Sequence, residues 1–431
     1  MNRLSIQVTD WLGGTADAED VTFGALVITA EDQGLILTEV SDLIAQATRN
    51  AIRVPVIRLA EWLVAHWWRL RWEARPTIPT SEWHHAHNMA AIGGGIAWPP
   101  LEISSDGEFV QISLAREPQR DAAGIRYLNG VSGLEVAADD FEGAVDGFLD
   151  LVDNRVRTVL PASSEFADLR DELRSERSDP QLARMCRWQA RAGIDAGDGS
   201  AEWFHDFDEI AREAGAAATE DLCAVLSDPR AAGCFVAEAK RSTLGVDLTS
   251  VAGVDRRGLV GKPWERGALA ARRVREALGF GTDPIANDRL SELLGTNLPA
   301  TPNAPPGRAV SGGFRSDLAL GQTNVVVAAS RAENQRFFFA RLVGLATELP
   351  PDTGHLLPVT SAKTAIQKFG RAFAQEFLCP WSEIEAATER AGYDESVRRE
   401  LAERFIVSEM VVTTALVNRG KLDRASLEDY C

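Results

Sequence analysis

The sequence lacks the features of membrane, secreted and disulfide-stabilised proteins. No stretch approaches the roughly 20 uninterrupted apolar residues that a membrane-spanning helix needs. The first residues, MNRLSIQVTDWLGG, contain neither an apolar core segment nor a small-residue cleavage site, so no secretory signal is predicted. The five cysteines are scattered and form no Cys-x-x-Cys pair. We therefore expect a cytoplasmic protein with reduced, structural thiols and no membrane partner.

The chain also lacks the basic excess that is typical of proteins that coat nucleic acid. Its 45 Lys and Arg residues face 63 Asp and Glu residues, and the formal net charge is −18. The segment from Arg49 to Arg75 is an exception, because its six arginines face only Glu61 and Glu73. A basic segment on an acidic protein is compatible with a local phosphate site, since acid elsewhere limits non-specific binding. A solvated arginine face on a helix explains the same pattern.

At 431 residues the chain is too long for one typical core, so two or three domains are expected. We predict an α+β protein that is mostly helical. Residues 1–135 are expected to form an N-terminal α+β domain. Residues 136–261 are expected to form a central helical region that ends in a glycine-dotted connector, and residues 262–431 a C-terminal domain.

Local patterns support the mixed character of the N-terminal part. Two β-branched or apolar runs, 21–29 and 34–40, flank a polar tetrapeptide and predict a hairpin. A helix is expected from Val56 to Glu73, and residues 108–114 predict another strand. From Asp139 onward, apolar residues recur at three- and four-residue spacing, which predicts helices with one buried face.

Several segments of the C-terminal part resemble, in the same order, segments of a known family. They comprise a strand-like run, the helix after it, a helix that ends in proline, and two closing helices. Their sequences are NVVVA at 324–328, NQRFFFARLVGLA at 334–346, FAQEFLCP at 373–380, LAERFIVS at 401–408 and ALVNRGKL at 415–422. Together they resemble the ImmA/IrrE-type metallopeptidases. The resemblance implies a zincin-like helical domain with a small sheet over residues 262–431.

The residues that would hold zinc in such a domain are missing. The family uses two histidines one helical turn apart, with a glutamate beside them as general base. At the corresponding positions this chain has Arg341, Leu342 and Leu345. A leucine offers no lone pair, and an arginine brings a fixed positive charge to a cation site. The family's third ligand is acidic, whereas residues 367–370 contain no carboxylate. We therefore expect no metal, no cofactor and no peptidase activity.

The domain that remains is a scaffold with three conceivable uses. Its former active helix is apolar on most of its circumference, as expected of a helix buried on several sides. The emptied cleft is filled core, a ligand pocket with Arg341 as an anion contact, or a docking surface for a partner protein. Glu348, His355 and Glu376 lie nearby, in the wrong register to rebuild a zinc site. The resemblance also implies a context of DNA damage, mobile elements or phage response, without specifying a reaction.

Aromatic and ionisable residues gather between residues 61 and 98. Four of the six histidines and six of the eleven tryptophans fall there. On a helical wheel, the predicted helix carries an apolar stripe and, beside it, a stripe of different chemistry. The second stripe consists of Arg58, Trp62, His66, Arg69 and Glu73, and a downstream segment adds His84, His85, His87 and Asn88.

These residue types suit chemistry on a nucleotide that is extruded from its strand. Aromatic faces replace lost base stacking and arginines hold phosphates, while a histidine or glutamate moves a proton or activates water. The catalytic candidates are His66, Glu73 and His87. The binding candidates are Arg58, Trp62, Arg69, His84, His85 and Asn88. A sugar or a nucleotide second messenger would suit the same groups, and the tryptophans would equally serve to pack two domains together.

Three weaker signals complete the sequence evidence. The clustered histidines lack a matching set of cysteines or carboxylates, so no metal is expected there either. Asp228 with Glu238 and Lys240 faintly resembles the Asp…Glu-x-Lys pattern of Mg²⁺-dependent nucleases, a pattern that is common by chance. Gly93–Gly95 lacks the Lys-Ser/Thr of a phosphate-binding loop and predicts a turn.

The sequence supports two functional hypotheses. In the first, an intracellular bacterial stress- or phage-defence protein acts on DNA as a glycosylase- or nuclease-type hydrolase through its N-terminal cluster. Its partner is nucleic acid, with a further protein partner conceivable at the peptidase-dead C-terminal scaffold. In the second, the protein is a non-catalytic sensor or regulator whose C-terminal domain binds a ligand or a partner protein. The first hypothesis requires an open cleft at the cluster, and the second predicts a closed one.

Overall fold

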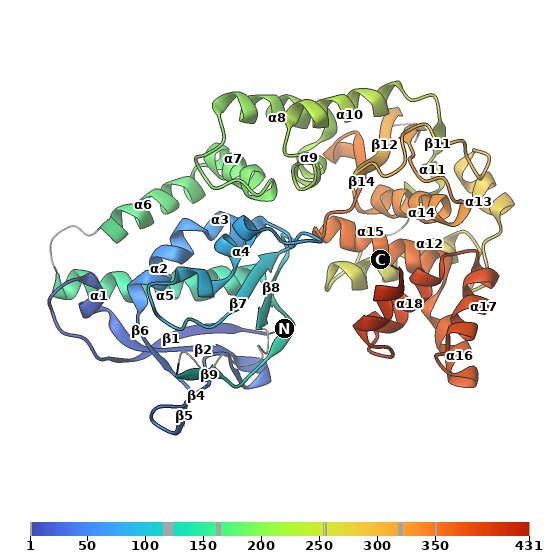
Figure 1. The fold of residues 1–431 in the computed structure, drawn as a ribbon. Coiled ribbons are helices and arrows are strands. Elements are labelled where there is room, and N and C mark those ends of the chain that lie inside the picture. Colours follow the sequence, from blue (N-terminus) through green and yellow to red (C-terminus); the bar gives the residue numbers. More distant parts are fainter. Residues whose placement is uncertain are drawn as a thin grey trace. The chain divides into compact units, whose positions relative to one another are not determined.

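The computed structural model describes residues 2–114, 124–160, 165–252, 254, 257–317, 322–349 and 351–430. Helices predominate and several small sheets accompany them, which is the mostly helical α+β fold predicted from the sequence (Figure 1). The chain divides into two compact units, Met1–Ser200 and Ala201–Cys431, here called unit 1 and unit 2. The boundaries expected near residues 135 and 261 fall inside these units. No described helix combines the length and the apolar character that a membrane span requires.

The described part of unit 1 contains three small antiparallel sheets. One joins β1 (Leu4–Trp11), β2 (Phe23–Ala30), β3 (Leu35–Ile36) and β6 (Ile52–Pro55); another joins β7 (Leu101–Ser105), β8 (Phe109–Leu114) and β10 (Val131–Ala137); the third joins β4 (Val40–Asp42), β5 (Ala47–Arg49) and β9 (Ile125–Tyr127). The predicted hairpin is confirmed, because Thr29 pairs with Ile36 across the short helix η1 (Glu31–Gln33). The strand expected at residues 108–114 is β8.

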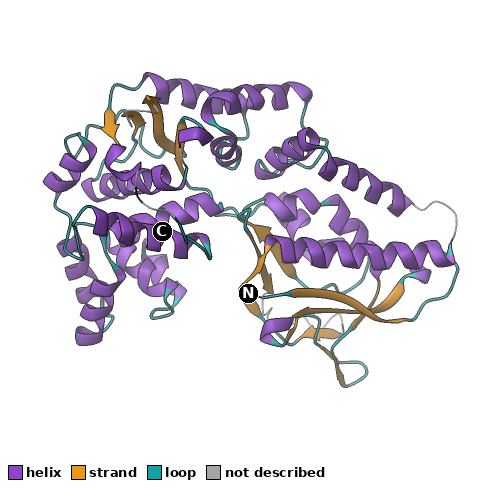
Figure 2. Cartoon of the chain, turned by 180° about the vertical axis from the view of Figure 1, so that it is seen from behind, coloured by secondary structure: helices purple, strands orange, loops and turns teal. Residues whose placement is uncertain are grey.

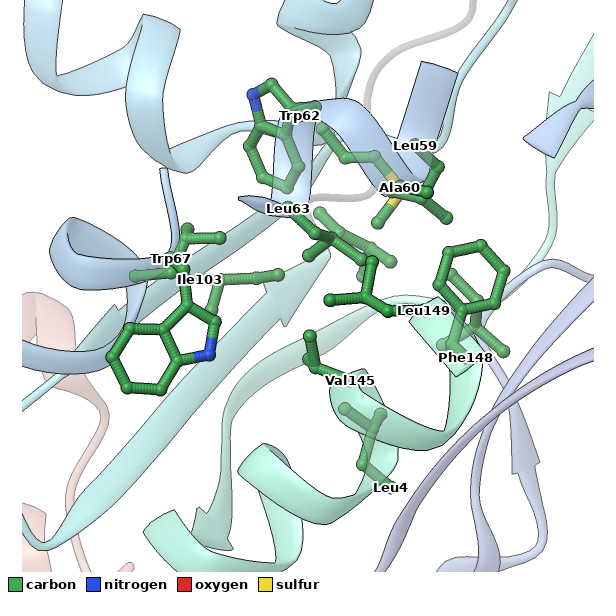
Figure 3. Packing of buried hydrophobic residues seen from close by; sticks show 14 of the residues in the cluster. Leu4, Leu59, Ala60, Trp62, Leu63, Trp67, Ile103, Val145, Phe148 and Leu149 are labelled. Atoms are coloured by element: carbon green, nitrogen blue, oxygen red, sulfur yellow. The ribbon is translucent and has the colours of Figure 1, made fainter. Parts of the chain in front are cut away.

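Helices cover these sheets and supply most of the core of unit 1. They are α1 (Ala18–Val21), α2 (Val56–Ala65), α3 (Trp67–Trp72), α4 (Ser81–His87), η2 (Met89–Ile92), α5 (Ala138–Val159), α6 (Glu165–Ser178) and α7 (Pro180–Arg191). The apolar face expected from Asp139 onward is the buried face of α5, with Phe141, Val145 and Phe148 inside the core. Figure 3 shows side chains of α2 and α5 meeting in that core.

The helix predicted from Val56 to Glu73 is broken at His66. This residue ends α2 and begins α3 with φ −108° and ψ 11°, outside helical geometry. Its amide still donates to the carbonyl of Trp62, and its own carbonyl accepts from the amide of Leu70. Backbone hydrogen bonding therefore bridges the break, and the side-chain stripes of α3 are turned relative to those of α2.

Unit 2 is built from helices around one antiparallel sheet in the order β11-β13-β12-β14 (Figure 2). The strands are β11 (Gly245–Asp247), β12 (Val310–Asp317), β13 (Gln322–Val326) and β14 (Leu356–Thr360). The helices are α8 (Ala201–Ala214), α9 (Ala216–Cys223), α10 (Pro229–Arg241), α11 (Thr249–Ala252), α12 (Pro263–Ala277), α13 (Asn287–Leu294), α14 (Ala332–Glu348), η4 (Pro351–Thr353), α15 (Ala365–Leu378), α16 (Trp381–Ala391), α17 (Glu395–Phe405), α18 (Glu409–Asn418) and η5 (Arg424–Tyr430). The segment expected to be a connector, 245–261, thus contributes β11 and α11.

Two glycines allow α15 to pack very closely against its neighbours. A Cβ atom on Gly267 of α12 would lie 2.4 Å from the carbonyl oxygen of Phe369. A Cβ atom on Gly344 of α14 would lie 2.6 Å from the ring of Phe373. Neither distance is compatible with a side chain, so these positions require glycine. The result is a dense contact of α12, α14 and α15 in the core of unit 2.

Three buried arginines tie helix ends together in unit 2. Arg275 donates to the carbonyl of Phe377 in the last turn of α15, and Arg315 donates to the carbonyl of Leu349, which follows α14. Arg336 donates to the carbonyl of Ile406, which follows α17. Carbonyls at a helix C-terminus have no partner within the helix and carry partial negative charge, so they suit a guanidinium group.

The described cysteines, Cys186, Cys223, Cys234 and Cys379, are free thiols, and Cys431 lies outside the described residues. Burial raises the pKa of Cys186 and of Cys379 to about 12. Both groups are therefore protonated and unreactive at neutral pH.

Candidate functional site

Five of the six tryptophans of the N-terminal cluster belong to the core of unit 1, and Trp72 packs against it partly buried. Trp62, Trp67, Trp68, Trp83 and Trp98 are all buried, and Figure 3 shows Trp62 and Trp67 packed among aliphatic side chains. The indole of Trp62 donates to the main-chain carbonyl of His85 at 3.4 Å. These rings are therefore not placed as open plates on which an extruded base could stack.

The ionisable candidates do converge, as a buried network. Oε2 of Glu73 accepts from Nε of Arg69 at 2.7 Å and lies 2.8 Å from Nε2 of His87. Exposure is 6% for Arg69, 8% for Glu73 and 0% for His87. Trp83 stacks on the His87 ring, with centroids 4.4 Å apart and planes inclined by 9°. Trp83 thus covers one face of the His87 ring, and all three ionisable groups are buried.

The protons of His87 follow from its two partners. Nδ1 lies 2.6 Å from the carbonyl oxygen of Ile103, which can only accept, so Nδ1 carries a proton. Nε2 faces Glu73, which also accepts from Arg69. The side chain of Glu73 is therefore shared by Arg69 and His87, and removal of any one of the three leaves a buried polar group without its partner.

Asp195 extends the network to the surface. Nη1 of Arg69 donates to Oδ1 of Asp195 at 3.3 Å, and Nδ1 of His66 lies 3.9 Å from the same oxygen. Interaction with the His66 ring lowers the pKa of Asp195 below its usual range; partial burial opposes this shift, and the charge of Arg69 supports it. The ring of His85 meets that of His66 edge to face, with centroids 5.9 Å apart. His66, His85 and Asp195 are the partly exposed end of the network.

The remaining binding candidates have structural partners. Arg58 forms an ion pair with Glu19 at 2.8 Å. His84 lies 3.3 Å from Glu102. The side chain of Asn88 accepts from the amide of Ala90 and so caps η2. The segment Gly93–Gly95 has positive φ at all three glycines and forms the predicted turn.

The guanidinium group of Arg341 is buried and held inside unit 2. Nη2 of Arg341 donates to the carbonyl of Thr360 at 2.8 Å and to the amide oxygen of Gln367. Leu342 and Leu345 are fully buried in the core of unit 2. Gln367 stands within the segment where the family resemblance implies the third ligand. An arginine and an amide therefore satisfy one another at this position.

A buried carboxylate from a distant helix completes this arrangement. Asp221 of α9 accepts from the side-chain amide of Gln367 and from the hydroxyl of Thr364. Burial lowers the pKa of Arg341 to about 9; the charge of Arg371 acts in the same direction and that of Asp221 against it. Among the described residues, no three or more His, Cys, Asp or Glu side chains are grouped so that they could hold a metal ion.

A cleft of about 260 Å³ lies elsewhere in unit 2. Its lining is mostly polar: Glu238, Arg241, Ser242, Thr243, Asn303 and Val326. Two members of the faint nuclease pattern are engaged here, because Glu238 pairs with Arg308 at 2.6 Å and Lys240 pairs with Glu213. Asp228, the third member, caps the start of α10 by accepting from the amide of Arg230. The pattern therefore does not assemble a cluster of catalytic carboxylates.

Comparison with known proteins yields no relative. No family model, curated protein or solved structure matches the chain.

Proposed function

We propose that the protein is a non-catalytic sensor or regulator whose unit 2 is a peptidase-like scaffold without a metal centre. The observation that carries the proposal is the guanidinium of Arg341, held by Gln367 and by the carbonyl of Thr360. A cation built into the chain repels a metal ion from the same position and needs no cofactor to remain there. The family resemblance supports a setting in bacterial stress or phage response.

The closed N-terminal cluster supports a regulatory rather than a catalytic role. Glu73 and His87 are buried, Trp83 stacks on His87, and Trp62, the tryptophan proposed to stack a base, is a core residue. Buried and fully partnered charges fix a conformation, whereas a catalytic acid or base must reach its substrate. In this role, unit 1 is a rigid body that transmits or displays a signal.

The polar cleft of unit 2 is the part we propose to bind a ligand. Arg241 and Thr243 offer hydrogen-bond donors beside the carboxylate of Glu238, whereas Ser242 and Asn303 already donate to the carbonyl of Val325. Val326 adds an apolar floor. A small polar molecule or an extended polar segment of a partner protein matches these groups better than an apolar one.

The first test measures metal content and peptidase activity of the full chain. After incubation with excess zinc and desalting, elemental analysis is expected to find no stoichiometric zinc, and peptide substrates are expected to stay intact. The second test compares wild type with Thr243→Trp, which fills the cleft, and with Arg230→Trp at the exposed start of α10, the helix that precedes Thr243. Native mass spectrometry of protein purified from its host is expected to show a bound ligand or partner that Thr243→Trp loses and Arg230→Trp keeps. Stoichiometric zinc, or retention by both variants, would contradict the proposal.

One observation favours a second candidate, a DNA-directed hydrolase. His66 and His85 lie side by side at the partly exposed end of the network, and Asp195 is within 4 Å of His66. A histidine oriented by a carboxylate is a general acid or base, and a second imidazole beside it could accept the proton. In this version the buried Arg69, Glu73 and His87 position Asp195 and do not touch the substrate.

The second candidate is tested by base release and strand cleavage on ordinary and modified DNA. His66→Ala is expected to abolish the activity, whereas His205→Ala, an exposed histidine of unit 2, is expected to preserve it. Absence of any product with wild type, or equal activity in both variants, ends this candidate and leaves the regulatory proposal intact.

A further inference from the structure

The polar cleft of unit 2 has two groups of opposite charge on one turn of α10. Glu238 and Arg241 stand three residues apart at the C-terminal end of this helix, and both line the cleft. Side chains at this spacing lie on the same face of a helix, with Cβ atoms about 5–6 Å apart. A ligand in the cleft therefore meets a carboxylate and a guanidinium group together.

The guanidinium group of Arg241 has donors that no neighbour uses. Its Nε donates to the carbonyl of Ala237 at 3.1 Å, and its two Nη groups have no partner among the residues that the structure describes. The side chain is also exposed, whereas the neighbouring Lys240 is paired with Glu213. The planar fork of a guanidinium group matches the two oxygens of a carboxylate. Arg241 is thus placed to hold an anionic group of a ligand.

Glu238 offers an oxygen for a cationic group. Its Oε2 accepts from Arg308 at 2.6 Å, whereas its Oε1 has no partner within the described part of the chain. The side chain is 38% exposed. The end of α10 adds negative potential, because the last carbonyls of a helix carry partial negative charge. An ammonium group suits this position.

The rest of the lining limits the size of the ligand. Ser242 and Asn303 both donate to the carbonyl of Val325 and so form a fixed wall. The hydroxyl of Thr243 has no partner among the described residues, and Val326 contributes an apolar surface. The volume of about 260 Å³ lies below the roughly 300–1,000 Å³ of sites that hold drug-sized molecules. The cleft therefore suits a ligand of few atoms.

We propose that this cleft binds a free α-amino acid, with the carboxylate of the ligand on Arg241 and its ammonium group on Glu238. Both charges of an α-amino acid are attached to one carbon atom, so a single small molecule supplies the two groups that the lining matches. A simple anion would face the like charge of Glu238, and a simple cation would face that of Arg241. The inference rests on the ligand-binding role proposed for the same cleft and specifies the class of ligand.

The test measures thermal unfolding of the full chain by differential scanning calorimetry in the presence of each of the standard amino acids. A molecule that binds the folded protein raises the unfolding midpoint as its concentration increases. At least one amino acid is expected to do so. Its N-acetyl and carboxamide derivatives, which each lack one of the two charges, are expected to have no effect. Isothermal titration calorimetry then gives the Kd of the amino acid that binds.

Three variants locate the binding. Arg241→Gln is expected to weaken it at least about tenfold, because the variant loses a pair of charge-assisted hydrogen bonds. Arg230→Gln removes the same charge from an exposed position at the other end of α10 and is expected to leave the Kd unchanged. Thr243→Trp, which fills the cleft, is expected to abolish binding. Circular dichroism checks that each variant is folded.

The outcomes distinguish failure of this inference from failure of the proposed function. If no amino acid affects wild type, the inference is overturned; loss of a co-purified ligand in Thr243→Trp would then still show that the cleft binds another class of molecule. Equal binding by wild type and Arg241→Gln also overturns it. Equal binding of an N-acetyl derivative overturns the free amino acid as ligand and assigns the cleft to the C-terminal carboxylate of a partner chain.

Discussion

Oε2 of Glu73 lies 2.8 Å from Nε2 of His87 and accepts at the same time from Arg69, so a single carboxyl oxygen joins two side chains inside unit 1. The three residues come from the end of α3 and from α4, and a loop residue, Asp195, also accepts from Arg69. The guanidinium of Arg69 therefore has two carboxyl partners. Such pairing allows a charged group to remain in a core.

Replacing Glu73 by Gln is expected to destabilise unit 1 strongly. The amide cannot neutralise Arg69, and removing one partner of a buried ion pair costs about 3–5 kcal/mol. Urea unfolding followed by tryptophan fluorescence measures the change. Glu172→Gln, at an exposed position of α6, is the matched control and is expected to change stability by less than about 0.5 kcal/mol. If both variants were equally stable, the network would make no net contribution to the free energy of unfolding.

The difference in stability between wild type and the Asp195→Asn variant is expected to change as the pH is lowered into the acid range. Interaction with His66 and the charge of Arg69 lower the pKa of Asp195 below its ordinary value of 3.8. The folded state therefore binds this proton more weakly than the unfolded chain does. The contribution of ionised Asp195 to the free energy of unfolding is fully present above pH 3.8. It is lost as the pH falls through the lower pKa that Asp195 has in the folded protein. Thermal unfolding from neutral to acid pH is expected to show the wild-type advantage shrinking below that pH; a constant difference would contradict the assignment.

Arg336→Lys is expected to destabilise unit 2 although it keeps the charge. The guanidinium donates to the carbonyl of Ile406 at 3.0 Å, to the side chain of Asn287 and to the carbonyl of Ile285 at 2.6 Å. A single ammonium group cannot reach all three acceptors, and each lost bond to a charged group costs about 1.5–3 kcal/mol. Chemical unfolding is expected to show a loss of about 3 kcal/mol or more. Arg289→Lys, at an exposed position of α13, is expected to be neutral.

Thiol labelling is expected to distinguish the cysteines by burial. Cys234 is exposed, whereas burial raises the pKa of Cys186 and of Cys379 to about 12. Only the thiolate reacts, so a maleimide is expected to modify Cys234 in the folded protein and the three buried thiols, Cys186, Cys223 and Cys379, only in urea. Mass spectrometry of peptides reads the sites, with Cys234→Ser as control. Rapid labelling of Cys379 without denaturant would show that unit 2 opens readily.

Local sequence patterns predicted the elements of this fold better than its polar contacts. The hairpin at β2 and β3, strand β8 and the buried face of α5 each follow from residues close together in the sequence. The break at His66 has no such signal, since neither proline nor glycine stands there. It separates α2 from α3 although the apolar spacing continues across it.

The missed partners are distant in sequence and chemically ordinary. Asp195 lies in a loop 126 positions from Arg69, and Asp221 lies 146 positions from Gln367. Neither aspartate belongs to a recognisable motif, so only the folded chain brings each to its site. One partner of His87 is likewise a main-chain atom, the carbonyl oxygen of Ile103. Because every residue type supplies such a carbonyl, the sequence does not indicate this contact.

The arginines that tie helix ends in unit 2 also bear on how this sequence can diverge. Arg275, Arg315 and Arg336 each hold at least one main-chain carbonyl, an acceptor that every amino acid supplies. The residue that carries the carbonyl is therefore free to change, while the arginine is not. Related proteins that use such contacts would keep the arginine at each position. The residue that supplies the carbonyl could change independently, so the two positions would not covary as side-chain contacts usually do. Such a fold could persist after its sequence had ceased to resemble any other.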